Sequence, residues 1–343
     1  MTASIFRARF SRLVALALSA LTLGSLLTSC GQPAAEGEKL TIYSGRSEEF
    51  IAPFLEQFTA ETGIEFDVRY GDSAALAAQL LEEGENSPAD IFLSQDAGSL
   101  GAVSGAQLLA QLPNQILSRV ESKYQSPSSD WIGVTGRVRV FAYAPDRVSS
   151  LPQTIDDLTD AAWRGRLGIA PTNGSFQTFV TALIQARGEA AAERWLAAIK
   201  ANQPVLYEKN SQIMEAIDSG QIDIGLVNHY YLWEVAEELG RDINVKIDFF
   251  QAGDLGNLVN AAGAGILSTS QKKESAQSLI SFLLRDDIQQ KFVTDTHEYS
   301  LVLPSLWPEG LPALVEVASP AVDLASLSDL RRTQELLIKV GLI

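Results

Sequence analysis

The sequence is poor in the side chains from which sulfur and imidazole sites are built. It has one cysteine, Cys30, and two histidines, His229 and His297, among 343 residues. A single cysteine cannot form a disulfide within the chain, and a zinc cluster of cysteine and histidine ligands needs several of these residues. The sequence therefore excludes a disulfide framework and argues against a structural zinc site.

Basic residues are also scarce. The chain has 26 lysines and arginines against 42 aspartates and glutamates, which gives a formal net charge of −16 at pH 7. A protein of that charge repels a phosphate backbone, so nucleic acid is not expected as a partner. Since 46% of the residues are hydrophobic and 20% are charged, the chain can bury a core, and its length suits one large or two ordinary domains.

A long apolar run lies near the N-terminus. Residues 13–27 form an uncharged run of 15 residues behind Arg7, Arg9 and Arg12. A membrane-spanning helix needs about 20 apolar residues, whereas a secretory signal peptide has a shorter run behind a positive start. We therefore expect residues 1–29 to be a signal peptide that directs export.

The apolar run is followed by a pattern that matches the bacterial lipobox, Leu-Thr-Ser-Cys-Gly at residues 27–31. In a lipobox, a diacylglycerol is attached to the cysteine and the chain is cut just before it. We expect lipidation at Cys30, with residues 30–38 as a flexible tether and the lipid as the only contact with the membrane. Each buried CH₂ of an acyl chain contributes about 0.8 kcal/mol, so two or three chains anchor firmly. An ordinary signal peptide with a chance cysteine is the alternative.

Beyond the tether, short strands alternate with amphipathic helices. Strands are predicted at residues 40–44, 64–70 and 89–94, with helical periodicity at 51–58 and 73–83 between them. A strand, a helix and a strand within about thirty residues favour parallel pairing through right-handed crossovers. The sequence therefore predicts an α/β protein.

A second series of the same kind follows Trp131. It contains expected strands at 134–143, 167–170, 222–227 and 243–249, and expected helices at 176–187, 193–200, 211–219 and 272–292. Two such series predict two α/β lobes. Parallel sheets bind ligands at the carboxyl ends of their strands, so a ligand site is expected between the lobes.

Motifs of the common enzyme classes are missing from the sequence. It has no P-loop, no His-Glu-x-x-His, no Gly-x-Ser-x-Gly and no Gly-x-Gly-x-x-Gly behind a strand. A serine triad would need His229 or His297, and neither lies in a recognisable context. We therefore expect a binding protein rather than an enzyme.

Polar segments follow four of the predicted strands, at residues 43–48, 94–96, 171–176 and 228–231. In the third segment, Pro-Thr-Asn-Gly-Ser-Phe joins a strand to a helix, where backbone N–H groups and the helix dipole favour an anion. Each segment alone is also typical of a helix cap or a loop. Together, at equivalent ends of different strands, they predict one binding site.

Several segments resemble the ferric-ion-binding proteins of bacterial ABC iron importers, which are two-lobed, transferrin-like substrate-binding proteins. The resemblance covers nearly all of the chain beyond the tether. Its clearest segments are Leu-Thr-Ile-Tyr-Ser-Gly-Arg at 40–46, Trp-Ile-Gly-Val-Thr-Gly-Arg-Val-Arg-Val at 131–140, Tyr-Glu-Lys-Asn-Ser at 207–211 and Asn-His-Tyr-Tyr at 228–231.

The resemblance implies a type II periplasmic-binding-protein fold, with two α/β lobes joined by a two-strand hinge. The N-lobe would comprise residues 39–137 and 261–311, and the C-lobe residues 138–260 and 312–343. The hinge strands, expected near 135–139 and 260–264, would let the lobes close on a ligand.

In this family a tandem pair of tyrosines supplies two phenolate ligands to Fe³⁺, and the resemblance places them at Tyr230 and Tyr231. Fe³⁺ is a hard cation that favours anionic oxygen, and this chain offers carboxylates and phenols rather than thiols. Adjacent tyrosines on a regular strand point to opposite faces, so both reach one ion only if the chain turns there. Tyr70, at the end of a predicted strand, is a candidate third ligand. An aromatic pair packed between helices is the alternative.

The resemblance also implies a synergistic anion, carbonate or phosphate, bound together with the iron. The residues that it assigns to the anion are Gln95, Asn173, Gly174, Ser175, Asn210 and Asn228. The guanidinium groups of Arg137 and Arg46 would add charge-assisted hydrogen bonds.

Three positions depart from the family pattern. Ser47 stands where many members have a histidine ligand, Gln95 where they have a glutamate ligand, and Phe176 where some have a further tyrosine. Two tyrosines leave most positions of an octahedral ion open, to be filled by the anion, water or another tyrosine. We therefore expect an iron site that depends more strongly on its anion, or a changed ligand.

The resemblance implies a monomer that delivers iron to an ABC transporter permease and its ATPase. Its place would be the periplasm or the outer face of the cytoplasmic membrane, where the lipid on Cys30 holds it. Neighbouring branches of the same fold bind other solutes. An organic anion, a phosphonate or a thiamine-like solute, held without metal, is therefore the alternative ligand.

Overall fold

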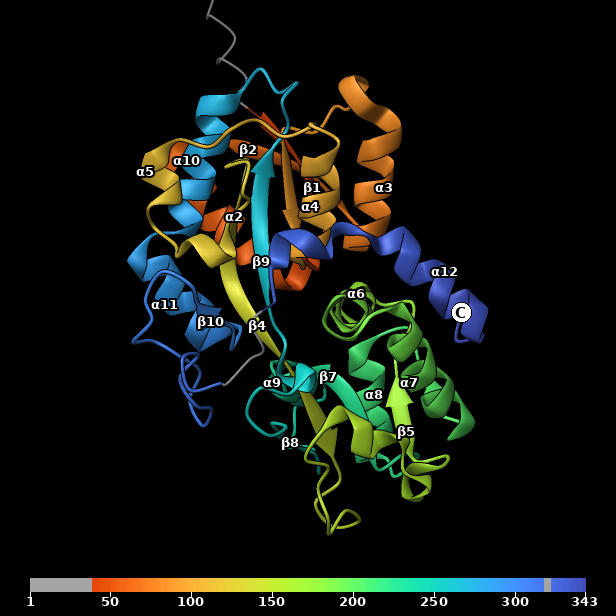
Figure 1. Ribbon diagram of the computed structural model, residues 1–343. Helices are drawn as coiled ribbons and strands as arrows, with labels where there is room; N and C mark the ends of the chain where they lie inside the picture. The colour runs from red at the N-terminus through yellow and green to blue at the C-terminus, as the bar shows by residue number, and fades with distance from the viewer. Residues whose placement is uncertain (1–38, 318–321) are drawn as a thin grey trace, which may run out of the picture. The chain divides into compact units, whose positions relative to one another are not determined.

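The computed structural model describes residues 39–317 and 322–343 (Figure 1). The expected signal peptide at 1–29, the expected lipidation site Cys30 and the tether at 30–38 lie outside the described residues. Within the described ranges, none of the helices is both long and apolar enough to cross a membrane.

The first sheet begins with three parallel strands. β1 (Lys39–Ser44) lies between β2 (Glu65–Tyr70) and β3 (Ile91–Ser94), and β9 (Val259–Ile266) pairs antiparallel with β3. The helices α2 (Glu48–Thr62) and α3 (Ser73–Glu83) form the crossovers between the parallel strands. Parallel strands joined by helices confirm the predicted α/β class.

The local sequence determines both the buried face and the end of helix α2. Its apolar side chains lie three and four residues apart, and Ile51, Phe54 and Phe58 are buried on one face. Gly63 follows the last turn in the left-handed conformation, with φ 77°, and its N–H donates to the carbonyl of Thr59. A side chain would strain this conformation, so the glycine sets the end of the helix.

Strand β4 (Trp131–Tyr143) joins the two series of strands (Figure 1). Its residues 131–138 pair antiparallel with β9, and its residues 139–143 pair antiparallel with β7 (Ile224–Asn228). β8 (Lys246–Asp248) pairs with residues 141–143. β4 therefore changes neighbours between Val138 and Arg139.

This change of neighbours bears on the expected hinge. It falls inside the segment 135–139 and one residue beyond the expected lobe boundary at residue 137. The other expected hinge segment, 260–264, lies within β9, which is paired with β4 on one side and with β3 on the other. The hinge and the lobe boundaries stay predictions.

The second series contains β5 (Leu167–Ile169), which pairs parallel with β7 and with β6 (Val205–Leu206). Its helices are α6 (Gly174–Arg187), α7 (Glu189–Ala201), α8 (Asn210–Asp218) and α9 (Tyr231–Glu238). Helices α6, α8 and α9 follow β5, β6 and β7 in the chain. Their N-termini therefore share the carboxyl edge of these strands, which is where ligands bind in such sheets.

The single helix expected at 272–292 is in fact two helices, α10 (Lys273–Leu283) and α11 (Asp286–Asp295). The break lies at Arg285, which has extended backbone angles (φ −69°, ψ 142°). The guanidinium of Arg285 binds Glu61 and Asp287, with N–O distances of 2.6 Å to each. The expectation was wrong because this contact depends on Glu61, which lies far away in the sequence.

The remaining elements are α4 (Ala97–Gly105), α5 (Asn114–Leu117), β10 (Tyr299–Ser300) and α12 (Leu330–Val340). β10, which the sequence did not predict, pairs antiparallel with Thr135 and Gly136 of β4. α12 packs against α6 and α7, while the short 3₁₀ helix Leu324–Ser328 packs against α4 (Figure 1). The segment 312–343, expected in the C-lobe, thus contacts elements of both series.

Candidate functional site

The tandem tyrosines lie where β7 ends and α9 begins. Tyr230 has helical backbone angles (φ −68°, ψ −19°), so the chain turns here as the sequence requires. The two rings are neighbours, with centroids 4.4 Å apart and planes inclined by 31°. Their side chains are 3% and 8% exposed. Tyr230 and Tyr231 therefore form a ring pair that is almost closed to solvent.

Two arginines of β4 stand near this pair and face the same side of the strand, because they are two residues apart. Arg137 donates from Nη1 to the phenol oxygen of Tyr230 at 3.4 Å. Arg139 donates to Oγ of Ser175 at 3.4 Å and to the carbonyl of Leu226 at 3.3 Å. The two arginines are 1% and 2% exposed, so the site contains two buried cations.

Burial shifts the proton affinities of both kinds of group. It lowers the pKa of Arg139 to about 9, with the charge of Arg137 as the second cause. It also raises the pKa of Tyr231 well above the ordinary value, with further contributions from Tyr230 and Glu234. The Tyr231 phenol therefore keeps its proton at neutral pH unless a cation displaces it.

Several buried polar atoms at this site have no hydrogen-bond partner within the described part of the chain. They are Nε and Nη2 of Arg137, Nε of Arg139, Nδ2 of Asn228 and Oδ1 of Asn210. A buried donor left unpaired costs about 1–3 kcal/mol, and more when it is charged. Four of these five atoms are donors, so the donor set fits an anion.

The N-terminus of α6 is part of the same polar network. The side-chain oxygen of Asn173 accepts from the N–H of Ser175 at 3.1 Å and from its Oγ at 2.6 Å. Asn210 donates from Nδ2 to Oγ of Ser175 at 3.3 Å. Because Ser175 also accepts from Arg139, the structure brings these predicted anion residues together around one serine.

Carboxylates face this helix end. A Cβ added at Gly174 would lie 3.6 Å from Oδ2 of Asp96 and 3.8 Å from Oδ2 of Asp72. Asp96 is 1% exposed, and its Oδ1 accepts from the N–H of Ser99 at 2.7 Å. Burial raises the pKa of the Asp96 carboxyl. An anion bound at the N–H groups near Gly174 would therefore be a close neighbour of Asp96.

Arg46 has a partner of its own. Its Nη1 donates to Oε1 of Glu298 at 2.9 Å, and its guanidinium carbon lies 3.6 Å from the ring centroid of Phe50. The side chain of Glu298 is fully buried. Arg46 thus already has a carboxylate partner within the protein, and its expected role at the anion stays a prediction.

Two other predicted residues make no hydrogen bond or ring contact with the tyrosine pair in the ranges that the structure describes. Tyr70 ends β2 and is half-buried, and its pKa is raised by burial and by the nearby carboxylates of α2. In the described ranges it makes no hydrogen bond or ring contact with Tyr230 or Tyr231. Gln95 follows β3, and its backbone N–H donates to Oγ of Ser73 at 2.9 Å. The roles of Tyr70 and Gln95 stay predictions.

The positions that depart from the family pattern offer no strong ligand. Ser47 precedes α2, is exposed, and makes no side-chain capping bond to the helix. Phe176 is fully buried beside the guanidinium of Arg139, whose carbon lies 5.4 Å from its ring centroid. Neither position therefore offers an ionised side chain as a ligand.

The two histidines do not replace the ligands expected at these positions. The N–H of Val138 donates to Nδ1 of His229 at 3.1 Å, so the ring is neutral and its Nε2–H donates to the carbonyl of His297 at 2.7 Å. Burial lowers the pKa of His229 to about 4. His297 stacks on Trp233 with centroids 4.5 Å apart. In the ranges that the structure describes, no group of three or more His, Cys, Asp or Glu side chains is placed to hold a metal.

Sequence reasoning missed two residues of this site. Arg139 could have been found, because strand alternation places it on the same face as Arg137. Glu298 gave no local signal, since its partner Arg46 is 252 residues away in the chain.

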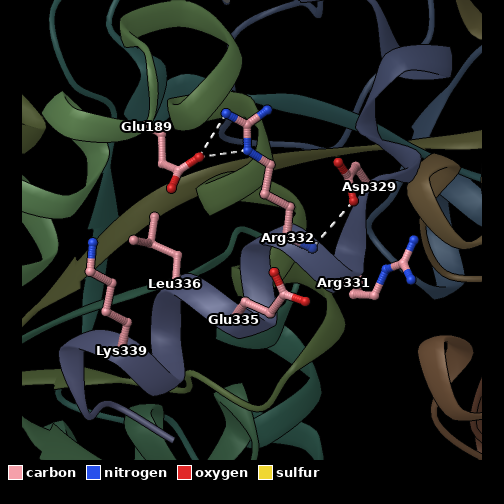
Figure 2. Close-up of a pocket in the computed structure, with 7 residues that line it drawn as sticks. All are labelled: Glu189, Asp329, Arg331, Arg332, Glu335, Leu336 and Lys339. Atoms are coloured by element: carbon pink, nitrogen blue, oxygen red, sulfur yellow. Dashed lines mark hydrogen bonds and ion pairs between the residues drawn. The ribbon is translucent and has the colours of Figure 1, made fainter.

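A cavity of about 540 Å³ lies elsewhere, between α7 and α12 (Figure 2). Charged side chains surround it, and Arg332 spans it to Glu189 at 2.7 Å. Its lining residues are Glu189, Asp329, Arg331, Arg332, Glu335, Leu336 and Lys339. None of the predicted site residues lines this cavity.

Comparison with known proteins places the chain among transport proteins. A family model described as bacterial extracellular solute-binding protein matches residues 86–319. The chain is 32% identical over 337 residues to the Fe(3+)-binding periplasmic protein of Serratia marcescens, which covers 97% of this chain and 99% of that protein. It is 31% identical over 309 residues to the major ferric iron-binding protein of Neisseria meningitidis serogroup B, covering 88% and 93%.

A solved structure agrees with these matches. Iron-bound HitA from Pseudomonas aeruginosa has a TM-score of 0.84 and 33% sequence identity to this chain, and the match covers 89% of this chain and 99% of that one. The similarity confirms the predicted two-lobed type II fold. The chain therefore belongs to the bacterial extracellular solute-binding proteins, the family that includes these periplasmic ferric iron-binding proteins.

Proposed function

We propose that this protein binds ferric iron together with an anion outside the cytoplasm and delivers the iron to an ABC transporter. One observation carries the proposal. Two buried phenols, Tyr230 and Tyr231, lie beside the buried guanidinium groups of Arg137 and Arg139, which have donors without acceptors. Phenolate is a hard oxygen ligand that suits Fe³⁺, and the free donors suit an anion. The relatives described above are ferric iron-binding proteins.

Each phenol must lose its proton when it binds iron. Burial and the neighbouring Tyr230 raise the pKa of Tyr231, whereas the charge of Arg137 lowers it. Arg137 also donates to the Tyr230 oxygen at 3.4 Å. Iron binding should therefore release protons and weaken as the pH falls.

The anion, carbonate or phosphate, would accept from the unpaired donors of Arg137, Arg139 and Asn228. It would also neutralise two buried cations, which are costly to leave uncompensated. Its own oxygens would fill positions on the iron that two phenolates leave open. Because Ser47 and Gln95 carry no charge, we expect iron binding to depend strongly on the anion.

Access to the site requires movement. Tyr230 and Tyr231 are 3% and 8% exposed, so iron cannot reach both phenols without an opening of the structure. The change of strand neighbours at Val138 and Arg139 lies beside the site and is the natural place for a hinge. Ligand binding would then stabilise the closed form through contacts from both lobes.

The relatives and the N-terminal sequence support a location outside the cytoplasm. The Serratia marcescens relative is a periplasmic protein. The expected signal peptide would direct export and be cut off before Cys30, and the expected lipid on Cys30 would then hold this chain in the periplasm or at the outer face of the cytoplasmic membrane. There it would act as a monomer that delivers iron to a permease and its ATPase.

The experiment is an absorption titration with ferric citrate in bicarbonate buffer. Tyrosinate bound to Fe³⁺ should give a charge-transfer band in the visible, and the double variant Tyr230→Phe, Tyr231→Phe should lose it. Tyr143→Phe, at the far end of β4, is the control and should keep the band, and Tyr70→Phe tests the third candidate ligand. Absence of the band in the wild type, or its survival in the double variant, contradicts the proposal.

A second candidate ligand is an organic anion or phosphonate held without metal. The network of Arg139, Ser175 and Asn210 favours it, because these groups would hold an anion by themselves. Calorimetric binding of such a solute in the presence of a chelator, without any visible band on adding iron, would support this candidate against iron.

A further inference from the structure

The buried carboxylate of Glu298 has no role in the binding of iron and anion proposed above. Its Oε1 accepts from Arg46 at 2.9 Å and lies 4.0 Å from Nε of Arg137. Its Oε2 accepts from the hydroxyl of Thr135 at 2.6 Å. The carboxylate has no exposed surface, so it is a negative charge placed between two buried arginines.

The backbone fixes this position from two sides. Glu298 directly precedes β10, in which Tyr299 pairs with Gly136 of β4, and the N–H of Glu298 donates to the carbonyl of Phe292 at 3.3 Å. The preceding residue, His297, has a φ of 53°, which is uncommon for a residue with a side chain. Its carbonyl accepts from His229, the residue directly before Tyr230. Glu298 is therefore held both by β4 and by the segment that carries the tyrosines.

The buried arginines near the unpaired donors outnumber the carboxylates that form ion pairs with them. Arg46, Arg137 and Arg139 are all buried, and Arg139 has no ion pair within the described residues. Burial lowers the pKa of Arg137, but three neighbouring acidic groups raise it. Tyr230 contributes most, Glu298 next and Asp96 least. Nε of Arg137 lies near Glu298 but makes no hydrogen bond to it. Arg137 is thus shared between Glu298 and whatever binds its free donors.

We propose that Glu298 is the resident counter-charge of the anion site, which sets the strength of anion binding by holding Arg46 away from the anion and competing for Arg137. The inference rests on the proposed function in one respect, that Arg137 and Arg139 receive an anion. It assigns Arg46 an indirect role: Arg46 occupies Glu298 and so leaves Arg137 available.

This assignment predicts opposite effects for the two partners. Glu298→Gln removes the competing charge and keeps a similar shape, so anion binding should become about tenfold tighter. Arg46→Gln frees Glu298 to bind Arg137 alone, so anion binding should become about tenfold weaker. A residue that only supports the fold would weaken binding in both variants or change neither.

The test is isothermal titration calorimetry of the iron-free protein with inorganic phosphate. Glu237→Gln, an exposed carboxylate of α9, is the matched control for the change of charge and should bind as the wild type does. Phosphate binding by Glu298→Gln that is equal to or weaker than that of the wild type overturns the inference. The double variant Arg46→Gln, Glu298→Gln should bind like Glu298→Gln, because Arg46 acts through Glu298. If Arg46→Gln weakens binding equally in both backgrounds, Arg46 is itself an anion ligand and the inference is wrong.

Two further outcomes are possible: Glu298→Gln does not fold, or the wild type binds no phosphate. Glu298→Gln leaves buried cations without a counter-charge and can fail to fold. In that event the double variant, which removes both charges, is compared with Arg46→Gln and should bind phosphate about a hundredfold more tightly; equal binding overturns the inference. If the wild type binds no phosphate, this inference fails, while the tyrosinate band still tests iron binding independently.

Discussion

Replacing Arg139 by methionine should stabilise the iron-free protein while it weakens anion binding. The arginine is 2% exposed, and its hydrogen bonds to Ser175 and Leu226 are long, at 3.4 and 3.3 Å. Its Nε has no partner in the described part of the chain. Methionine has a similar unbranched shape and would keep the contact with Phe176 and Phe179, whose ring centroids lie 5.4 and 5.3 Å from the guanidinium carbon.

The magnitude follows from the cost of the buried charge. The pKa of Arg139 is lowered from 12.5 to about 9, mainly by burial, and at 1.36 kcal/mol per pKa unit this corresponds to about 5 kcal/mol. The lost hydrogen bonds of a charged group offset about 1.5–3 kcal/mol. We expect a net gain of about 2 kcal/mol, or about 5 °C in Tm. Loss of one charge-assisted hydrogen bond should weaken phosphate binding about 10–100-fold.

Urea and thermal unfolding of the iron-free protein at pH 7 measure the first effect, and calorimetry with phosphate measures the second. Arg187→Met is the control, because Arg187 pairs with Asp156 on the surface, and surface ion pairs contribute little. If Arg139→Met lowers the free energy of unfolding and leaves phosphate binding unchanged, then Arg139 is a structural residue and the reasoning is refuted.

Three further predictions concern proton linkage and packing. The wild type should lose up to about 3 kcal/mol of stability as the pH falls from 6.5 to 4, because His229 has a pKa of about 4 when folded and near 6.5 when unfolded. In urea unfolding across this range, the free energy of unfolding of His229→Gln should fall less steeply with pH, and equal slopes contradict this. Gly263→Ala should cost about 1–3 kcal/mol in the same assay, because the new Cβ would lie 2.5 Å from the Ile132 carbonyl, whereas Gly105→Ala, with open space around it, should not destabilise; equal effects contradict this. Tyr231→Phe should release about one proton fewer on iron binding in an indicator titration, and an unchanged proton count contradicts its role as a ligand.

The local sequence pattern predicted those parts of the fold that depend on residues close together in the chain. The apolar stripe of α2 and its end at Gly63 are both visible in the sequence. The break between α10 and α11 is not visible, because Arg285 is held by Glu61, which lies 224 residues away in the sequence. Strand β10 has two residues, which is too short for any periodicity to show.

The same division applies to the site. The turn at Tyr230 and the cap at Asn173 follow from adjacent residues and were predictable. Arg139 was within reach of the sequence, since alternation along β4 places it beside Arg137. The ion pair of Arg46 with Glu298 was not, because it depends on how β10 and the first helix crossover meet across 252 residues. Long-range charge pairing thus gives Arg46 a buried carboxylate partner, which the sequence did not indicate.

The measurement that tests the central claim most directly is native mass spectrometry with elemental analysis of the protein purified from its own cells. The account predicts one iron per chain, accompanied by a small inorganic anion and by a visible tyrosinate band that Tyr230→Phe with Tyr231→Phe abolishes. Protein that carries an organic solute in place of iron, with no metal and no band, would contradict it.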